Sequence, residues 1–176
     1  MGYLRADGGI EKITDEDGWL ATGDVGALDE DGYLTITDRK KELIITSGGK
    51  NISPAQIENL LRAHPLIAEA VAIGDRRPYV TALIVLDDEV APQWAVAHGV
   101  TATGLAALAE DPTVRAEIQA AIDAANEKLS RPEQVKAYRI MASSWTPESG
   151  ELTPTLKLRR RIIIDRHTQT IDSLYH

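Results

Sequence analysis

The first part of the chain carries two short β-prone runs, at residues 25–29 and 33–37. An Asp-Gly pair at 31–32 lies between them and favours the tight turn of a β-hairpin. We therefore expect an antiparallel hairpin here. The charged residues 38–41 interrupt the apolar pattern and are predicted to form a linker, because residues 43–46 read as another strand.

A helix with strong start signals is predicted after a glycine-containing loop at residues 47–51. Ser53 is placed to cap this helix, Pro54 fits its first position, and Gln56 completes the pattern of a capping box. Its apolar face is predicted to consist of Ile57, Leu60 and Leu61.

Two longer apolar runs follow, at residues 66–73 and 79–86, and both read as strands. The turn between them contains glycine and proline, which predicts an antiparallel pair. A further strand is expected at residues 135–141.

The rest of the chain is predicted to be mainly helical. Asp88 is expected to cap a helix at 89–98, and Asp111 opens a longer helix to about residue 129. Residues 158–174 are predicted to form one last, moderately amphipathic helix. The apolar stripe of the long helix is predicted to consist of Val114, Ile118, Ala121, Ile122, Ala125 and Leu129.

The order of these elements predicts an α+β fold, with a small, antiparallel-rich sheet flanked by helices. The 176 residues, 43% apolar and 26% charged, fit a globular protein of one domain, or of one domain plus part of another. Cysteine is absent, which excludes disulfides and thiol catalysis. The net charge of −8 argues against nucleic acid as a partner. With no apolar run of the signal-peptide type at the N-terminus, a cytoplasmic protein is expected.

Two polar positions in the first part of the chain could bind a small molecule. Asp24 follows a glycine, and its carboxylate could accept two hydrogen bonds from a vicinal diol such as ribose. Arg39 offers a planar fork for phosphate or ribose oxygens, and the loop at 47–51 offers backbone donors. Each has a simpler interpretation, as a turn aspartate that binds backbone N–H groups and as a solvated charged turn.

Lys157 follows a hydroxyl-rich turn with a proline. An ammonium group held there could lie between a carboxylate and a phosphate, and it would relieve their repulsion during attack of one on the other. The simpler interpretation is a surface lysine at a helix start. The basic stretch around it, which could equally be a solvated helix face, contains Arg159, Arg160, Arg161 and Arg166.

Four motifs, taken in order, resemble the C-terminal end of acyl-adenylate-forming enzymes, and among these the long-chain fatty-acid–CoA ligases. They are G-W-L-x-T-G-D at 18–24, G-Y-L-x-I-x-D-R-K-K-E-L-I at 32–44, G-G-K-N-I-S-P-x-x-I-E at 48–58 and L-T-P-T-L-K at 152–157. The resemblance implies a lid domain that acts with Mg²⁺, ATP, a fatty acid and CoA.

The resemblance implies roles for five residues. Asp24 would hold the ribose hydroxyls of ATP, and Arg39 would contact the same nucleotide. Lys41 would lie at the hinge of the small C-terminal domain, and Gly48 would line the pantetheine tunnel for CoA. Lys157 would be the catalytic lysine of adenylation, with the basic stretch facing a nucleotide phosphate. No metal ligand is expected in this chain.

The family's large N-terminal domain holds its remaining nucleotide motif, its adenine pocket and its acyl tunnel. Residues 1–40 are expected to be the last strip of that domain, and residues 41–176 to be the C-terminal lid. The chain alone is therefore expected to be inactive, with at most peripheral contact with a membrane. Ile45 departs from the pattern, since some relatives carry a lysine there that is used in the second half-reaction.

Three alternatives stay open at this point. A fatty acyl-AMP ligase would make the same adenylate but pass the acyl group to a carrier protein. A stand-alone interaction module would have lost catalysis. A domain that binds anions or lipid surfaces through residues 159–166 is opposed by the net charge of −8.

Overall fold

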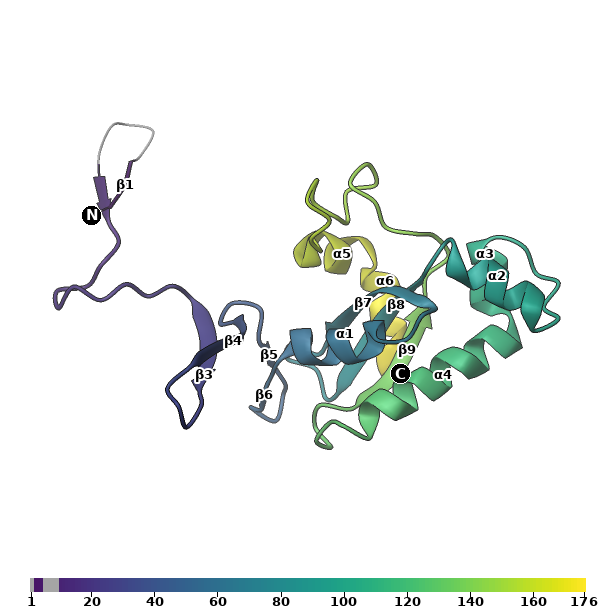
Figure 1. Cartoon of the computed structure of the whole chain (residues 1–176), viewed down its shortest axis with the longest axis horizontal. Coiled ribbons are helices and arrows are strands. Elements are labelled where there is room, and N and C mark those ends of the chain that lie inside the picture. The colour runs from purple at the N-terminus through teal and green to yellow at the C-terminus, as the bar shows by residue number, and fades with distance from the viewer. Residues whose placement is uncertain (1, 5–9) are drawn as a thin grey trace. The chain divides into compact units, whose positions relative to one another are not determined.

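The structure is a computed structural model that describes residues 2–4 and 10–176. The chain divides into two compact units, Met1–Glu42 and Leu43–His176 (Figure 1). This division lies close to the boundary that was expected after residue 40.

The first unit contains two small antiparallel hairpins. β1 (Gly2–Leu4) pairs with β2 (Ile10–Lys12), and β3 (Asp24–Leu28) pairs with β4 (Leu34–Arg39). Gly32 lies in the turn between β3 and β4 with a φ of +85°, a conformation that glycine adopts without strain. The hairpin predicted for this stretch is confirmed.

The prediction that residues 38–41 form only a linker is wrong for the first two of them. Asp38 pairs with Val25 and Arg39 pairs with Asp24, so both belong to β4. A register shift in β3 lets the ladder continue through the charged residues. Opposite charges in directly paired positions stabilise such a ladder, which explains how polar residues extend the strand.

The second unit is built on a three-stranded sheet in the order β7–β8–β9. β7 (Ile67–Ile73) and β8 (Val80–Leu86) are antiparallel, as predicted, and β9 (Val135–Ile140) joins β8 in parallel. Every residue of β8 is buried, because helices cover the sheet on both faces. The unbroken apolar run of β8 follows from this double coverage.

Four helices gather over one face of the sheet (Figure 1). They are α1 (Pro54–Arg62), α2 (Val90–Ala97), α3 (Leu105–Glu110) and α4 (Pro112–Asn126). The stripe predicted for the long helix is buried in this core, apart from a partly buried Ala121. Helix α3 was not predicted, since its six residues are too few for a helical period to be recognised.

The opposite face is covered by α5 (Arg160–Arg166), α6 (Thr168–Asp172) and the short 3₁₀ helix η1 (Ser173–Tyr175). This core also takes in Trp145 from the preceding loop. The mixed fold of strand pairs and flanking helices confirms the α+β prediction.

The prediction of one continuous helix over residues 158–174 is wrong. The chain turns at His167, where φ is −104° and ψ is 20°. The hydroxyl of Thr168 donates to the carbonyl oxygens of Ile164 and Asp165. Such local side-chain bonds compete with the helix ladder, so two short helices form in place of one.

Two of the three predicted helix caps are confirmed. Ser53 Oγ accepts the N–H of Gln56 at 3.2 Å, and the carboxylate of Asp111 caps α4 in the same manner. Asp88 does not cap α2, because the neighbouring Asp87 accepts the N–H groups at the start of that helix. Along the described part of the chain, no helix has the length and apolar character needed to cross a bilayer.

Candidate functional site

Asp24 and Arg39 occupy directly paired positions at the end of the β3–β4 hairpin that is remote from its turn. Arg39 Nε lies 3.1 Å from Asp24 Oδ1. The Arg39 side chain is 68% exposed and the Asp24 side chain 27% exposed. The hairpin register therefore brings together two residues that the sequence indicated separately.

This pair offers both hydrogen-bond acceptors and donors at one place. The ion pair joins Arg39 Nε to Asp24 Oδ1, and a carboxylate has two oxygens that can accept from both hydroxyls of a diol. The guanidinium of Arg39 keeps further N–H donors for an oxygen ligand. Thr22 Oγ1 accepts the N–H of Asp24, which fixes the chain entering the strand. The arrangement can bind a sugar next to an anionic group.

Lys41 lies in the exposed turn that follows β4. The N–H of Glu42 donates to the carbonyl oxygen of Arg39 at 2.9 Å and closes this turn. The two compact units divide immediately after it, between Glu42 and Leu43. Lys41 therefore lies in the turn next to the division between the two units.

The glycine loop, residues 47–50, connects β5 (Ile44–Ile45) and β6 (Asn51–Ile52) in a short antiparallel hairpin. The N–H of Gly49 donates to the carbonyl oxygen of Thr46 at 2.8 Å. Gly49 has a φ of +77°, which disfavours other residues at this position.

Gly48 is not required by the packing of the chain itself. A Cβ added at this position meets nothing closer than Thr46 Oγ1 at 3.8 Å, which is ordinary contact distance. Its φ also lies outside the left-handed region. The surface at Gly48 is therefore open to a ligand that needs to approach the backbone closely.

A neighbouring turn braces the glycine loop. The N–H of Ser47 donates to the carbonyl oxygen of Arg77, and the N–H of Arg76 donates to that of Ile45. The N–H of Ile45 in turn donates to the carboxylate of Asp75. The side chain of Ile45 is 50% exposed. The loop is thus held by backbone bonds from the β7–β8 connection.

The lysine turn, residues 152–158, closes on itself by short hydrogen bonds. The N–H of Thr153 donates to the carbonyl oxygen of Lys157 at 2.8 Å, and Thr153 Oγ1 accepts the N–H of Lys157 at 3.0 Å. Leu152 and Leu158 form an antiparallel bridge at its base. The hydroxyl-rich sequence therefore folds the turn, as the proline-containing pattern indicated.

The backbone just before Lys157 is strained. Leu156 has a φ of +58°, which costs a leucine on the order of 1–3 kcal/mol. The Lys157 side chain is exposed, and no carboxylate of the described residues lies within ion-pair distance of its ammonium group. The turn therefore presents a cation that is available to an incoming anion.

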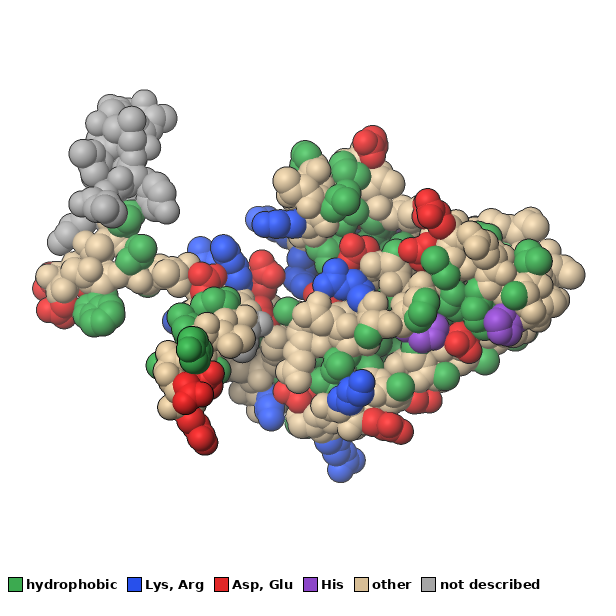
Figure 2. Space-filling model, in the orientation of Figure 1, with side chains coloured by type: hydrophobic (Ala, Val, Ile, Leu, Met, Phe, Trp, Pro, Cys, Tyr) green, Lys and Arg blue, Asp and Glu red, His purple; other side chains and the backbone are tan. Residues whose placement is uncertain are grey.

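The arginines that follow the lysine turn are not all directed outward. Arg160 pairs with the buried Glu58, and Arg166 pairs with the buried Glu151, each with a nitrogen–oxygen distance of 2.7 Å. Figure 2 shows basic side chains between α1 and α5 with acidic side chains among them. Arg161 is 94% exposed. The expected basic surface is therefore reduced, since two of its arginines have internal partners.

Sequence reasoning missed the carboxylates that hold these arginines. Glu58 was recoverable, because it lies on the buried stripe of α1 with Pro54, Ile57 and Leu61. A carboxylate on such a stripe needs a basic partner. Glu151 had no comparable signal, since it lies in a loop without periodicity.

The predicted residues of the second unit are kept on separate loops. Within the described ranges, no hydrogen bond or ion pair joins the glycine loop directly to the lysine turn. Both loops instead adjoin α1: the glycine loop leads to it through β6, and Arg160 after the lysine turn binds Glu58 on it. In the same ranges, no three His, Asp or Glu side chains are arranged to hold a metal ion.

The buried Glu151 should make stability depend on acid pH. Burial favours its neutral form, but hydrogen bonds from Ser149, Arg166 and the backbone, together with the charge of Arg166, lower the pKa of this carboxyl. A carboxyl group whose pKa is lowered in the folded state stabilises the fold at pH values above its unfolded-state pKa. That stability is lost as the pH falls through the folded-state pKa. We expect Glu151→Gln to lower the free energy of unfolding by about 1–3 kcal/mol at pH 7 and to reduce its fall between pH 7 and pH 3.

Thermal unfolding of the chain between pH 7 and pH 3 measures this effect. The exposed Glu148, in the same loop, supplies the matched control Glu148→Gln. An equal loss of stability at pH 7 and pH 3 in Glu151→Gln would contradict the assigned titration.

A sequence profile for the AMP-binding enzyme C-terminal domain matches residues 41–176. Over 99% of its length the chain is 47% identical to the long-chain-fatty-acid–CoA ligase FadD15 of Mycobacterium tuberculosis, of which it spans 29%. Over the same share it is 35% identical to human long-chain-fatty-acid–CoA ligase ACSBG1, of which it spans 27%. The chain thus spans less than a third of these curated relatives.

Solved structures share the same fold. The adenylation domain of a carboxylate reductase from Mycobacterium chelonae superposes on 93% of the chain with a TM-score of 0.74 at 23% identity, over 24% of its own length. The o-succinylbenzoate CoA synthetase of Bacillus subtilis, solved with an acyl-adenylate intermediate, covers 85% of the chain with a TM-score of 0.57 at 27% identity, over 25% of its own length. The profile match over residues 41–176 shows that the chain belongs to the AMP-binding enzyme C-terminal domain family.

Proposed function

We propose that the chain is the C-terminal part of an AMP-forming ligase that joins long-chain fatty acids to CoA. The observation that carries the proposal is the similarity along 99% of the chain to proteins named long-chain-fatty-acid–CoA ligases. The relatives favour CoA over a carrier protein as acceptor, and they favour an enzyme over a non-catalytic module.

The reaction divides into two displacements. In the first, the fatty-acid carboxylate attacks the α-phosphorus of ATP, an acyl-phosphate bond forms, and pyrophosphate leaves. In the second, the thiol of CoA loses its proton and attacks the acyl carbon, and AMP leaves. The first step brings two anions together, so it depends most on a positioned cation.

We propose roles for four residues that match the motifs of this family. Asp24 accepts from the ribose hydroxyls, and Arg39 beside it donates to the same nucleotide. Lys157 places its ammonium group between the carboxylate and the phosphate during the first step. Gly48 leaves room for the pantetheine arm of CoA in the second step. Mg²⁺ would enter this reaction bound to the phosphates of ATP.

We propose that residues 1–40 complete a larger adenylation domain and that residues 41–176 form the lid. The support is the surface of the first unit. Its described apolar side chains contribute nothing to the buried core, and several on β3 and β4 are more than half exposed. A larger domain would cover these side chains, which are Leu28, Leu34 and Ile36.

The experiment that tests the function compares the chain alone with the full-length protein that carries it. The chain alone should form no acyl-AMP and no acyl-CoA from palmitate, ATP and CoA, because the acyl tunnel would belong to the large N-terminal domain. The full-length protein should form both. Robust turnover by the chain alone, or none by the full-length protein, would contradict the proposal.

Any membrane contact of the chain should be peripheral and weak, since Arg160 and Arg166 have internal partners.

Lys41 is proposed as the hinge between the two half-reactions. Lys41→Pro should restrict φ at this position and hold the lid in one orientation. We expect one half-reaction to be slowed by at least roughly tenfold while the other is retained, because only one orientation stays accessible. Pre-steady-state measurement of acyl-AMP and acyl-CoA formation by the full-length protein checks this. Lys40→Pro is not a suitable control, since the N–H of Lys40 donates to Gly23. Lys41→Ala serves instead and should leave both rates nearly unchanged.

A further inference from the structure

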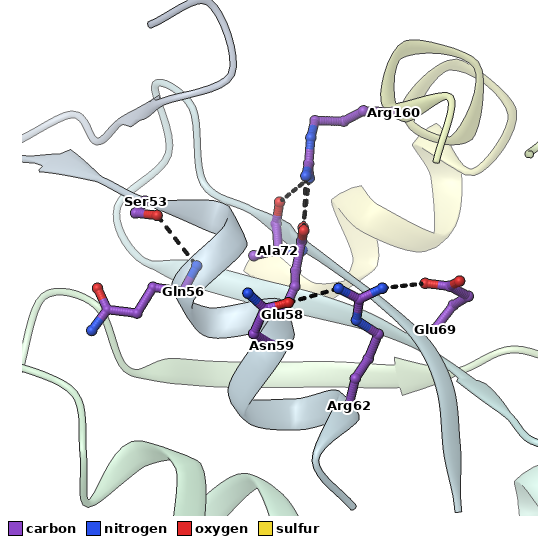
Figure 3. Close-up of polar contacts among 8 residues, drawn as sticks. All are labelled: Ser53, Gln56, Glu58, Asn59, Arg62, Glu69, Ala72 and Arg160. Carbon is purple, nitrogen blue, oxygen red and sulfur yellow. Dashed lines mark hydrogen bonds and ion pairs between the residues drawn. The ribbon is translucent and has the colours of Figure 1, made fainter. Parts of the chain in front are cut away.

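Two ion pairs link helix α1 to other elements of the second unit, and they differ in burial and in partner (Figure 3). The Glu58 side chain is 6% exposed and that of Arg160 is 20% exposed. In the second pair, Arg62 is 39% and Glu69 18% exposed. The first pair reaches α5, whereas the second joins α1 only to β7.

The buried pair interlocks three elements. Arg160 donates from Nη1 and Nη2 to the two carboxylate oxygens of Glu58, at 2.7 and 2.9 Å. Arg160 Nη1 also donates to the carbonyl oxygen of Ala72 on β7, at 3.2 Å. The N–H of Ala72 donates to Glu58 Oε1 at 2.8 Å. One guanidinium and one carboxylate therefore set α1, β7 and α5 in a single geometry.

Apolar packing also holds α1 on the sheet. Ile57 and Leu61 on the same helix are fully buried in the core and already fix its position. Apolar side chains in place of a buried ion pair often give equal or greater stability, because two charges need not be removed from water. What the pair adds is direction, since a bidentate bond defines both distance and orientation.

The bidentate bond fixes the orientation of the first residue of α5. Helix α5 has no side-chain cap at its N-terminus, and within it only Ile163 is fully buried. Arg160 is its first residue and lies three residues after Lys157. Three residues span at most about 10 Å, so a displacement of Arg160 is passed to the lysine turn. At the other side of the turn, Arg166 holds Glu151.

We propose that Glu58 and Arg160 are positioning residues for acyl-adenylate formation, because they fix the C-terminal end of the lysine turn, where it leads into α5, against α1. The proposal rests on the function proposed above for Lys157. The pair orients Lys157 without touching the substrates. Its loss should therefore affect the adenylation step and spare transfer to CoA.

The first test follows the lysine turn itself and does not depend on any activity. Amide hydrogen exchange is measured at Leu156 and Lys157, whose N–H groups both bind Thr153. Glu58→Gln should speed exchange at these amides by roughly tenfold or more, since it weakens the bond that holds the C-terminal end of the turn. The matched control is Glu69→Gln in the more exposed pair, which should leave exchange at these amides unchanged. Unchanged exchange in Glu58→Gln would overturn the proposal.

The second test separates positioning from stability in the full-length protein. Glu58→Gln should lower kcat of acyl-AMP formation at unchanged KM for ATP, with retained CoA transfer from supplied acyl-AMP. The double variant Glu58→Leu/Arg160→Leu removes both charges together, and it also leaves the N–H and carbonyl oxygen of Ala72 without these partners, so only part of the thermal stability should return. We expect its adenylation rate to stay low, because no directional bond remains. Recovery of that rate together with stability would show a purely structural pair and overturn the proposal.

These measurements also separate this proposal from the proposed function. If Lys157→Ala leaves adenylation intact, the proposed function of Lys157 fails. The exchange experiment then still decides whether Glu58 and Arg160 fix the turn. If Glu58→Gln does not fold, the double variant supplies both measurements in its place.

Discussion

Replacing Lys157 by alanine should reduce acyl-AMP formation in the full-length protein by roughly 10²- to 10³-fold, the usual loss when one group that stabilises transition-state charge is removed. The ammonium group is exposed on a closed turn and has no carboxylate partner among the described residues. Its full charge is therefore available where a carboxylate meets a phosphate. Pyrophosphate release under single-turnover conditions measures the effect.

The same Lys157→Ala variant should transfer the acyl group from supplied acyl-AMP to CoA at nearly the original rate. Arg161→Ala is a suitable control, because Arg161 lies close in sequence and is 94% exposed. An equal loss of both half-reactions would count against the assigned role. A large loss in Arg161→Ala would instead point to the general positive charge of the stretch.

Replacing Gly48 by alanine should slow acyl transfer to CoA and leave acyl-AMP formation unchanged, the reverse of what is expected for Lys157→Ala. The chain has room for the added methyl group, with its nearest neighbour at 3.8 Å, so stability should change by no more than about 0.5 kcal/mol. A pantetheine arm that passes over Gly48 would be displaced by the methyl group. A displacement of about 1 Å is enough for a roughly 10²-fold loss, which we expect in CoA transfer with adenylation retained.

Gly49→Ala distinguishes a steric effect on CoA from a disturbed loop. Gly49 has a φ of +77°, so alanine there should destabilise the loop by about 1–2 kcal/mol. Thermal unfolding of the two variants should therefore differ, with Gly48→Ala close to the original protein. If Gly48→Ala leaves CoA transfer unchanged, the assignment of Gly48 to the pantetheine path is lost.

Local signals in the sequence were sufficient for much of the fold. The Asp-Gly turn, the cap at Ser53 and the stripe of α4 each act over a few residues, so they could be identified directly. The break at His167 could not, because it depends on side-chain bonds that compete with the helix ladder. The parallel pairing of β9 with β8 was equally hidden, since it joins strands separated by three helices.

The candidate site was predictable only in part, for a similar reason. Lys157 and Gly48 lie in turns with recognisable composition, but their supports come from distant parts of the chain. Arg160 reaches a carboxylate 102 positions away, and Arg77 accepts a bond from Ser47 through its carbonyl oxygen. The pairing of Asp24 with Arg39 depends on a register shift that no composition rule signals.

The exposed apolar side chains of β3 and β4 have a consequence for the order of events during synthesis. A chain leaves the ribosome from its N-terminus, and a lid of this length takes on the order of 10 s to complete. In the proposed full-length protein, the adenylation domain would precede this chain. Its surface would be ready to receive Leu34 and Ile36 before the lid is finished. When the chain is made without that domain, the same two strands would emerge uncovered and favour aggregation between nascent chains.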